Sequence, residues 1–74
     1  MASEQSATGA ISTEIRACMA RGHRTQSELA AELGLSQPSV SARLKGEVPW
    51  DVDELAAVAS WLDIPLAELV ASAA

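Results

Sequence analysis

The chain has 74 residues, the size of one small domain, and 49% of them are hydrophobic although only two are aromatic. Its core must therefore come from Leu, Ile, Val and Ala, and because no alternating strand pattern is present, we predict an all-α fold. The chain contains one cysteine, one histidine and no Gly-rich phosphate loop, so we expect no disulfide, no metal or other cofactor, and no enzymatic activity. No apolar run approaches the roughly 20 residues that cross a bilayer.

The net charge is −5, but the charges are distributed unevenly along the chain. All five basic residues lie within 16–45, where two glutamates leave a local balance of +3, whereas 46–74 contains six acids and no base. Because local potential governs docking onto phosphates, the acidic total does not exclude a nucleic acid as partner. The alternative is that these charges only solvate the surface.

Residues 1–9 are predicted to be a disordered tail, followed by an ordered domain at 10–72. The tail lacks the basic and apolar regions of a secretory signal. Because a single cysteine cannot form an internal disulfide, we expect a protein of the reducing cytoplasm. A first helix is predicted at about 10–21, because its apolar residues recur on one face. These residues are Ile11, Ile15, Cys18 and Met19. Cys18 is therefore expected to be a core residue and not a catalytic one.

A second helix is predicted at about 26–33, with start and stop signals at both ends. Thr25 can cap its N-terminus, and Glu28 can complete a capping box. Gly34 can end the helix in the left-handed conformation that disfavours a Cβ.

A third helix follows at about 37–45, where Ser36 is a candidate cap and Pro38 falls in the first turn. Val40 and Leu44 point inward at i, i+4 spacing. The opposite face is small and polar and ends in basic residues, as suits a surface pressed into a groove. Two helices joined by a short turn that contains glycine form the helix-turn-helix unit of DNA-binding proteins.

Two more helices are predicted in the acidic remainder of the chain. Asp51 can cap a fourth helix that continues to about position 62, and Glu54 can complete its capping box. Pro65 opens a short fifth helix at about 66–71.

The five predicted helices resemble the Cro/repressor-like (Xre-type) helix-turn-helix family of phage and bacterial regulators. The resemblance covers about 11–71. It is carried by Gln26, Ala30, Gly34 and Val40 at the family's spacing, by SQPSVS, and by PWDVDELAAVASWLDIPLAELV. It implies a compact five-helix, lambda-repressor-like domain. It also implies a sequence-specific transcriptional regulator, namely a small Cro-like repressor of phage or prophage type that binds double-stranded DNA through the helix at 37–45.

The resemblance also implies which residues contact DNA, and their chemistry fits. A glutamine such as Gln37 can pair with N6 and N7 of adenine, and Pro38 and Ala42 can contact a thymine methyl group. Helix N-termini attract phosphate. The expected base-reading residues are Gln37, Pro38, Ser41 and Ala42. The expected phosphate contacts are Arg24, Thr25, Gln26, Ser36, Ser39, Arg43 and Lys45.

A homodimer is expected to place two such helices in successive major grooves of a near-palindromic operator, about 34 Å apart. Trp61, Leu66 and Val70 are the candidate dimer residues, although the core can also use them. No small-molecule ligand is evident. The alternative is a protein-interaction module or antitoxin that binds a partner through its acidic C-terminal half. A winged-helix protein would need a β-hairpin after Gly46, and the capped helix from Asp51 argues against it.

Overall fold

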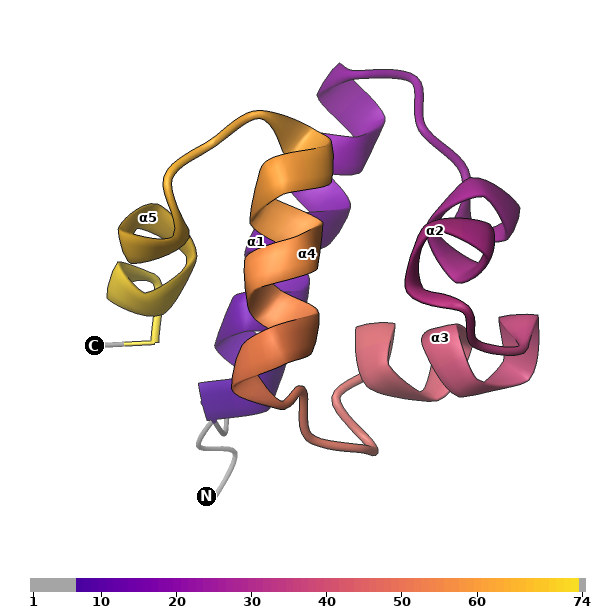
Figure 1. The fold of residues 1–74 in the computed structure, drawn as a ribbon. Helices are drawn as coiled ribbons and strands as arrows, with labels where there is room; N and C mark the ends of the chain where they lie inside the picture. The colour runs from indigo at the N-terminus through magenta and orange to yellow at the C-terminus, as the bar shows by residue number, and fades with distance from the viewer. Residues whose placement is uncertain (1–6, 74) are drawn as a thin grey trace.

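The computed structural model describes residues 7–73, which contain five helices joined by short turns (Figure 1). They are α1 (Ala7–Arg21), α2 (Gln26–Leu33), α3 (Gln37–Leu44), α4 (Val52–Leu62) and α5 (Leu66–Ala71). No strand occurs among these described residues, so the predicted all-α fold is confirmed.

The first helix begins at Ala7, three residues before the predicted start at position 10. Its first turn packs on the turn that follows α3. Gly9 and Gly46 approach so closely there that a Cβ on Gly46 would lie 3.3 Å from Gly9 Cα. Thr13 Oγ1 also donates a hydrogen bond to the Gly9 carbonyl at 3.0 Å. The helix therefore extends three residues into the range predicted for the tail. The rest of the predicted tail, residues 1–6, lies outside the described residues.

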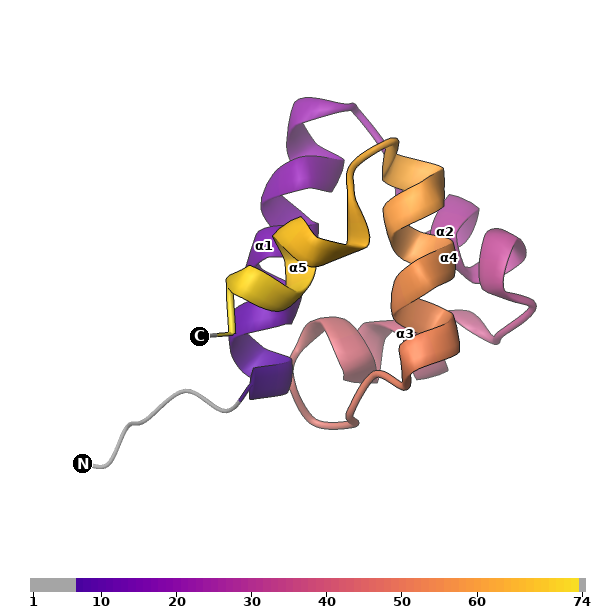
Figure 2. The same cartoon turned by 60° about the vertical axis from the view of Figure 1, so that its left-hand side comes forward.

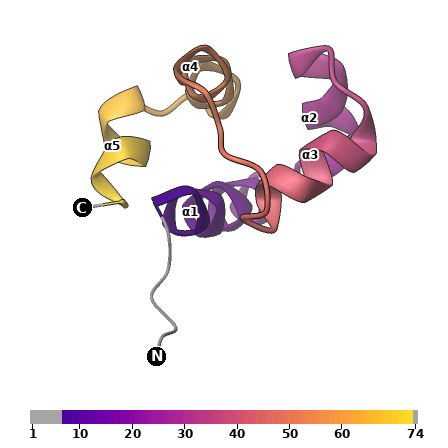
Figure 3. The same ribbon diagram turned by 90° about the horizontal axis from the view of Figure 1, so that it is seen from below.

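The helices α1 and α4 lie in the middle of the molecule, with α5 on one side and the α2–α3 pair on the other (Figures 1 and 3). Figure 2 shows α5 in front of α1, and the two helices are in contact. Every helix gives one fully buried aliphatic residue to a single core. These residues are Ile15, Leu29, Val40, Val58 and Leu69, each 0% exposed. The burial of each such side chain is worth about 1.5–3 kcal/mol.

A polar network, buried at Ser12 and Trp50, connects α1 to the end of α3. The Trp50 indole N–H donates to Ser12 Oγ at 2.9 Å, and the Ser12 hydroxyl donates to the Arg43 carbonyl at 2.5 Å. The Arg16 guanidinium donates to the Leu44 carbonyl. The last carbonyls of a helix have no partner within that helix, so two side chains of α1 supply partners at the end of α3 and fix its position.

Ser12→Ala removes the acceptor of the Trp50 N–H and one donor to the end of α3. Because a buried polar group is then left unpaired, we expect the free energy of unfolding to fall by about 1–3 kcal/mol. Urea denaturation followed by circular dichroism measures this change. Ser60→Ala, at an exposed serine of α4, is the matched control and should change the value by less than about 0.5 kcal/mol. Equal effects of the two substitutions would contradict the role given to Ser12.

Candidate nucleic-acid interface

The second helix begins and ends as its sequence predicts. Thr25 Oγ1 accepts from the Glu28 N–H at 3.1 Å, and the Glu28 carboxylate accepts from the Thr25 N–H at 2.8 Å, so the capping box is confirmed. Gly34 is left-handed, with φ 67°. The chain then turns so that the Leu35 N–H bonds to the Ala30 carbonyl at 3.0 Å, which aims the next helix across α2.

The third helix is capped by Ser36, whose Oγ accepts from the Ser39 N–H at 3.2 Å. Pro38 lies in its first turn, where no N–H is needed. The helix ends one residue before the predicted end, since Lys45 is its C-cap and Gly46 turns left-handed with φ 82°. An α-helix of eight residues therefore presents its N-terminal end beside the N-terminal end of α2.

An open hollow of about 320 Å³ lies where these two N-terminal ends meet. It brings together three of the expected base-reading residues and one expected phosphate contact. Its lining residues are Gln26, Gln37, Pro38 and Ser41. Ala42 does not line this hollow, but it follows Pro38 by four positions and so continues the same face of α3.

Ser27 does not line this hollow, but it contacts Gln37, which does, and the sequence analysis did not single it out. Its hydroxyl donates to Gln37 Oε1 at 3.1 Å, across ten positions of the chain. The two side chains are exposed. The signal that could have found Ser27 is the helix-turn-helix geometry, since it places the first turns of both helices side by side.

Arg43, an expected phosphate contact, is held within the protein. Its Nε and Nη2 donate to the two carboxylate oxygens of Glu54 at 3.1 and 3.2 Å, and its Nη1 donates to the Ser39 carbonyl at 3.0 Å. Both side chains of this ion pair are only 17% exposed. Glu54 also accepts from the Asp51 N–H in the capping box of α4. Arg43 therefore fastens α3 to the start of α4, and a phosphate could use only its remaining N–H groups or would have to break these bonds.

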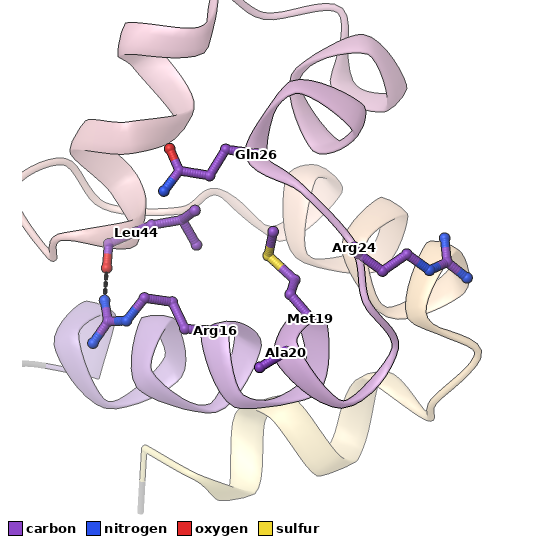
Figure 4. Close-up of a pocket in the computed structure, with 6 residues that line it drawn as sticks. All are labelled: Arg16, Met19, Ala20, Arg24, Gln26 and Leu44. Carbon is purple, nitrogen blue, oxygen red and sulfur yellow. Dashed lines mark hydrogen bonds between the residues drawn. The ribbon is translucent and has the colours of Figure 1, made fainter.

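A second hollow, of about 240 Å³, lies between α1, the start of α2 and the end of α3 (Figure 4). Its lining residues are Arg16, Met19, Ala20, Arg24, Gln26 and Leu44. The Arg24 side chain points away from Gln26 in Figure 4, and its Cζ lies 4.8 Å from the centroid of the Trp61 ring. This cation–π contact attaches the turn before α2 to α4.

Lys45 is the basic residue most available to a partner. It is exposed at the end of α3, and within residues 7–73 its side chain makes no ion pair or hydrogen bond. By contrast, Arg21 lies 3.8 Å from the Glu14 carboxylate on α1. Part of the positive charge of residues 16–45 is thus paired with carboxylates of the same domain.

The remaining features of the sequence fit a structural role. Cys18 is buried, as predicted, and burial, followed by its hydrogen bond with Glu14, raises the pKa of its thiol. Such a thiol is protonated and weakly nucleophilic at neutral pH. Among the described residues, no three His, Cys, Asp or Glu side chains are grouped to hold a metal ion. None of the described helices combines the length and hydropathy of a membrane span.

Two capped helices that meet across a glycine turn, with the second presenting a polar outer face, define a helix-turn-helix domain. A family model described as helix-turn-helix, of the Xre/Cro type, matches residues 15–69. The chain belongs to this family, whose members are DNA-binding transcription regulators. Comparisons with curated proteins and with solved structures give no match. The matched range contains every residue expected at the interface.

Arg43→Gln leaves the poorly exposed Glu54 carboxylate without its partner. Charged hydrogen bonds of this kind contribute about 1.5–3 kcal/mol, so we expect the free energy of unfolding, measured in urea, to fall by about that amount. Lys45→Gln removes the same charge two positions later at an exposed site and should change stability by less than about 0.5 kcal/mol. If Arg43→Gln proved as neutral as Lys45→Gln, Arg43 would not fasten α3 to α4.

Proposed function

We propose that the chain is a sequence-specific transcriptional regulator, a small Cro-like repressor of phage or prophage type that acts on DNA in the cytoplasm. In this proposal α3 enters the major groove of a double-stranded operator and blocks a promoter by occupying it. One observation carries the proposal. The structure gathers Gln26, Gln37, Pro38 and Ser41 in one hollow at the N-terminal ends of α2 and α3.

Base reading is assigned to the outward face of α3. Gln37 stands exposed at the first position of the helix, where its carboxamide can reach N6 and N7 of adenine. Pro38 and Ala42 follow on the same face and offer apolar contact to thymine methyl groups. Ser41 lines the same hollow as Gln37 and Pro38, and its hydroxyl can both donate and accept hydrogen bonds.

Backbone contact is assigned to the two helix starts and to the end of α3. Thr25 Oγ1 accepts from the Glu28 N–H, which leaves its hydroxyl proton to donate to a phosphate. At α3 the Ser36 hydroxyl donates to Ser39 Oγ at 2.9 Å, so the Ser39 proton is the one left for a phosphate. Gln26 lies at the first position of α2. Its side chain and the free N–H groups of this helix start can also bind phosphate.

Tight binding is assigned to a homodimer, because one copy offers few free cations. Arg43 is paired with Glu54 and Arg24 lies over Trp61, so Lys45 is the main charge left for phosphates. Two copies would double these contacts and match a near-palindromic operator, with the α3 helices about 34 Å apart. Of the candidate dimer residues, Val70 is 52% exposed, while Trp61 and Leu66 are half-buried against the core.

Selection from a random pool of duplexes at physiological salt tests this function directly. We expect an enriched motif of two inverted half-sites whose centres lie about 10 base pairs apart. A pool that yields no enriched half-site would contradict sequence-specific binding and would favour the alternative, a partner-binding module that uses the acidic C-terminal half.

Two substitutions on α3 separate base reading from backbone contact. Gln37→Ala should cost about 1–3 kcal/mol on the selected duplex and relax the preference at one base pair of each half-site. Lys45→Ala should weaken binding to all duplexes alike and lower the slope of log K against log salt by about one for each copy. Gel shifts at several salt concentrations measure both effects. Equal losses of base preference from the two variants would contradict this assignment.

Val70→Glu places a charge on the surface assigned to the dimer. We expect it to convert a complex of two chains per palindromic duplex into one chain per duplex, as measured by sedimentation velocity. Val52→Glu is the matched control, since Val52 is 72% exposed at the start of α4. If Val52→Glu abolished the two-chain complex and Val70→Glu did not, the dimer surface would lie elsewhere.

A further inference from the structure

The hydrogen bond from Ser27 to Gln37 is the one side-chain hydrogen bond between α2 and α3 among residues 7–73. Ser27 is the second residue of α2 and Gln37 is the first residue of α3. The bond therefore links the helix start assigned to backbone contact with the side chain assigned to base reading. We propose that Ser27 is a positioning residue that orients the Gln37 carboxamide and so makes the site prefer adenine to guanine. This proposal rests on the proposed function.

The orientation of the carboxamide decides which base it fits. Adenine presents an acceptor, N7, and a donor, the N6 amino group, so it requires both the amide oxygen and the amide nitrogen of a glutamine. Guanine presents two acceptors, N7 and O6, which the amide nitrogen alone can serve. A carboxamide that turns freely therefore accepts both purines, whereas one that is held with its oxygen and nitrogen in fixed places favours adenine.

Ser27 holds the carboxamide in this way. Its hydroxyl proton occupies one lone pair of Gln37 Oε1, and the second lone pair remains for the adenine amino group. The Gln37 Nε2 takes no part in this bond and remains available to donate to N7. Because Gln37 is exposed and otherwise has free rotamers, the bond lowers the conformational entropy lost when the base is bound.

The first part of the test is done on the free protein. In NMR spectra of the complete chain, we expect the Gln37 side-chain amide to be ordered in the wild type and mobile in Ser27→Ala. Ser27→Thr retains a hydroxyl and should restore the order. An amide of Gln37 that is equally mobile in all three proteins would overturn the proposal.

The second part uses the duplex selected by the wild-type protein and the same duplex with the A·T pair read by Gln37 replaced by G·C. The readout is the Kd for the G·C duplex divided by the Kd for the A·T duplex, which measures the preference for adenine. Ser27→Ala should lower this ratio about three- to ten-fold, the range for loss of one hydrogen bond, and Ser27→Thr should restore it within about two-fold. In a Gln37→Ala background, Ser27→Ala should leave the ratio unchanged within about two-fold.

Three outcomes of this binding test would overturn the role of Ser27. An unchanged ratio with unchanged affinities would show that it does not orient the carboxamide. A uniform loss of affinity for both duplexes would make it a phosphate contact, and an equal loss of the ratio in the Gln37→Ala background would show that it acts independently of Gln37. The proposed function fails separately, because it fails when the wild-type protein selects no motif at all.

Discussion

The anchoring of α3 is the constraint on which the interface depends. A helix of eight residues is too short to be stable alone, so its place is set by what holds its ends. Ser36 caps its start, Ser12 and Arg16 of α1 bind carbonyls at its end, and Arg43 reaches across to Glu54 of α4. The helix is thus attached to both central helices, and its outer face is left for a partner. These contacts fix the position of the outer face that we propose reads DNA.

The same anchoring explains the charge of the interface. The basic residues are concentrated between positions 16 and 45, and some of them hold helices together. They can do so because a guanidinium group can donate to carbonyls and carboxylates at once. Arg16 and Arg43 are used in this way, while the exposed Lys45 side chain makes no ion pair or hydrogen bond with residues 7–73. In the proposed function, affinity for a phosphate backbone therefore depends on helix N-termini and hydroxyl groups as much as on cations, which is why we assign tight binding to two copies of the chain.

Features that depend on local chemistry could be predicted from the sequence, and those that depend on tertiary contacts could not. The capping boxes at Thr25 and Asp51 each depend on residues within a stretch of four, and the structure confirms both. The earlier start of α1, the pairing of Arg43 and the bond from Ser27 each need a partner that is distant in sequence. Left-handed residues were also only partly predictable, because Gly34 was expected but His23, with φ 57°, was not. The assignment of single residues to bases or phosphates stays a prediction.

We infer that the N-terminal ends of α2 and α3 form the DNA-binding face, and that the acidic helices α4 and α5 do not. Titration of the ¹⁵N-labelled chain with the selected duplex, followed by NMR, tests this claim most directly. We expect the largest shift changes at the backbone amides of Gln26, Ser27, Gln37 and Ser39. Shift changes gathered on the exposed faces of α4 and α5, with α3 unperturbed, would contradict it.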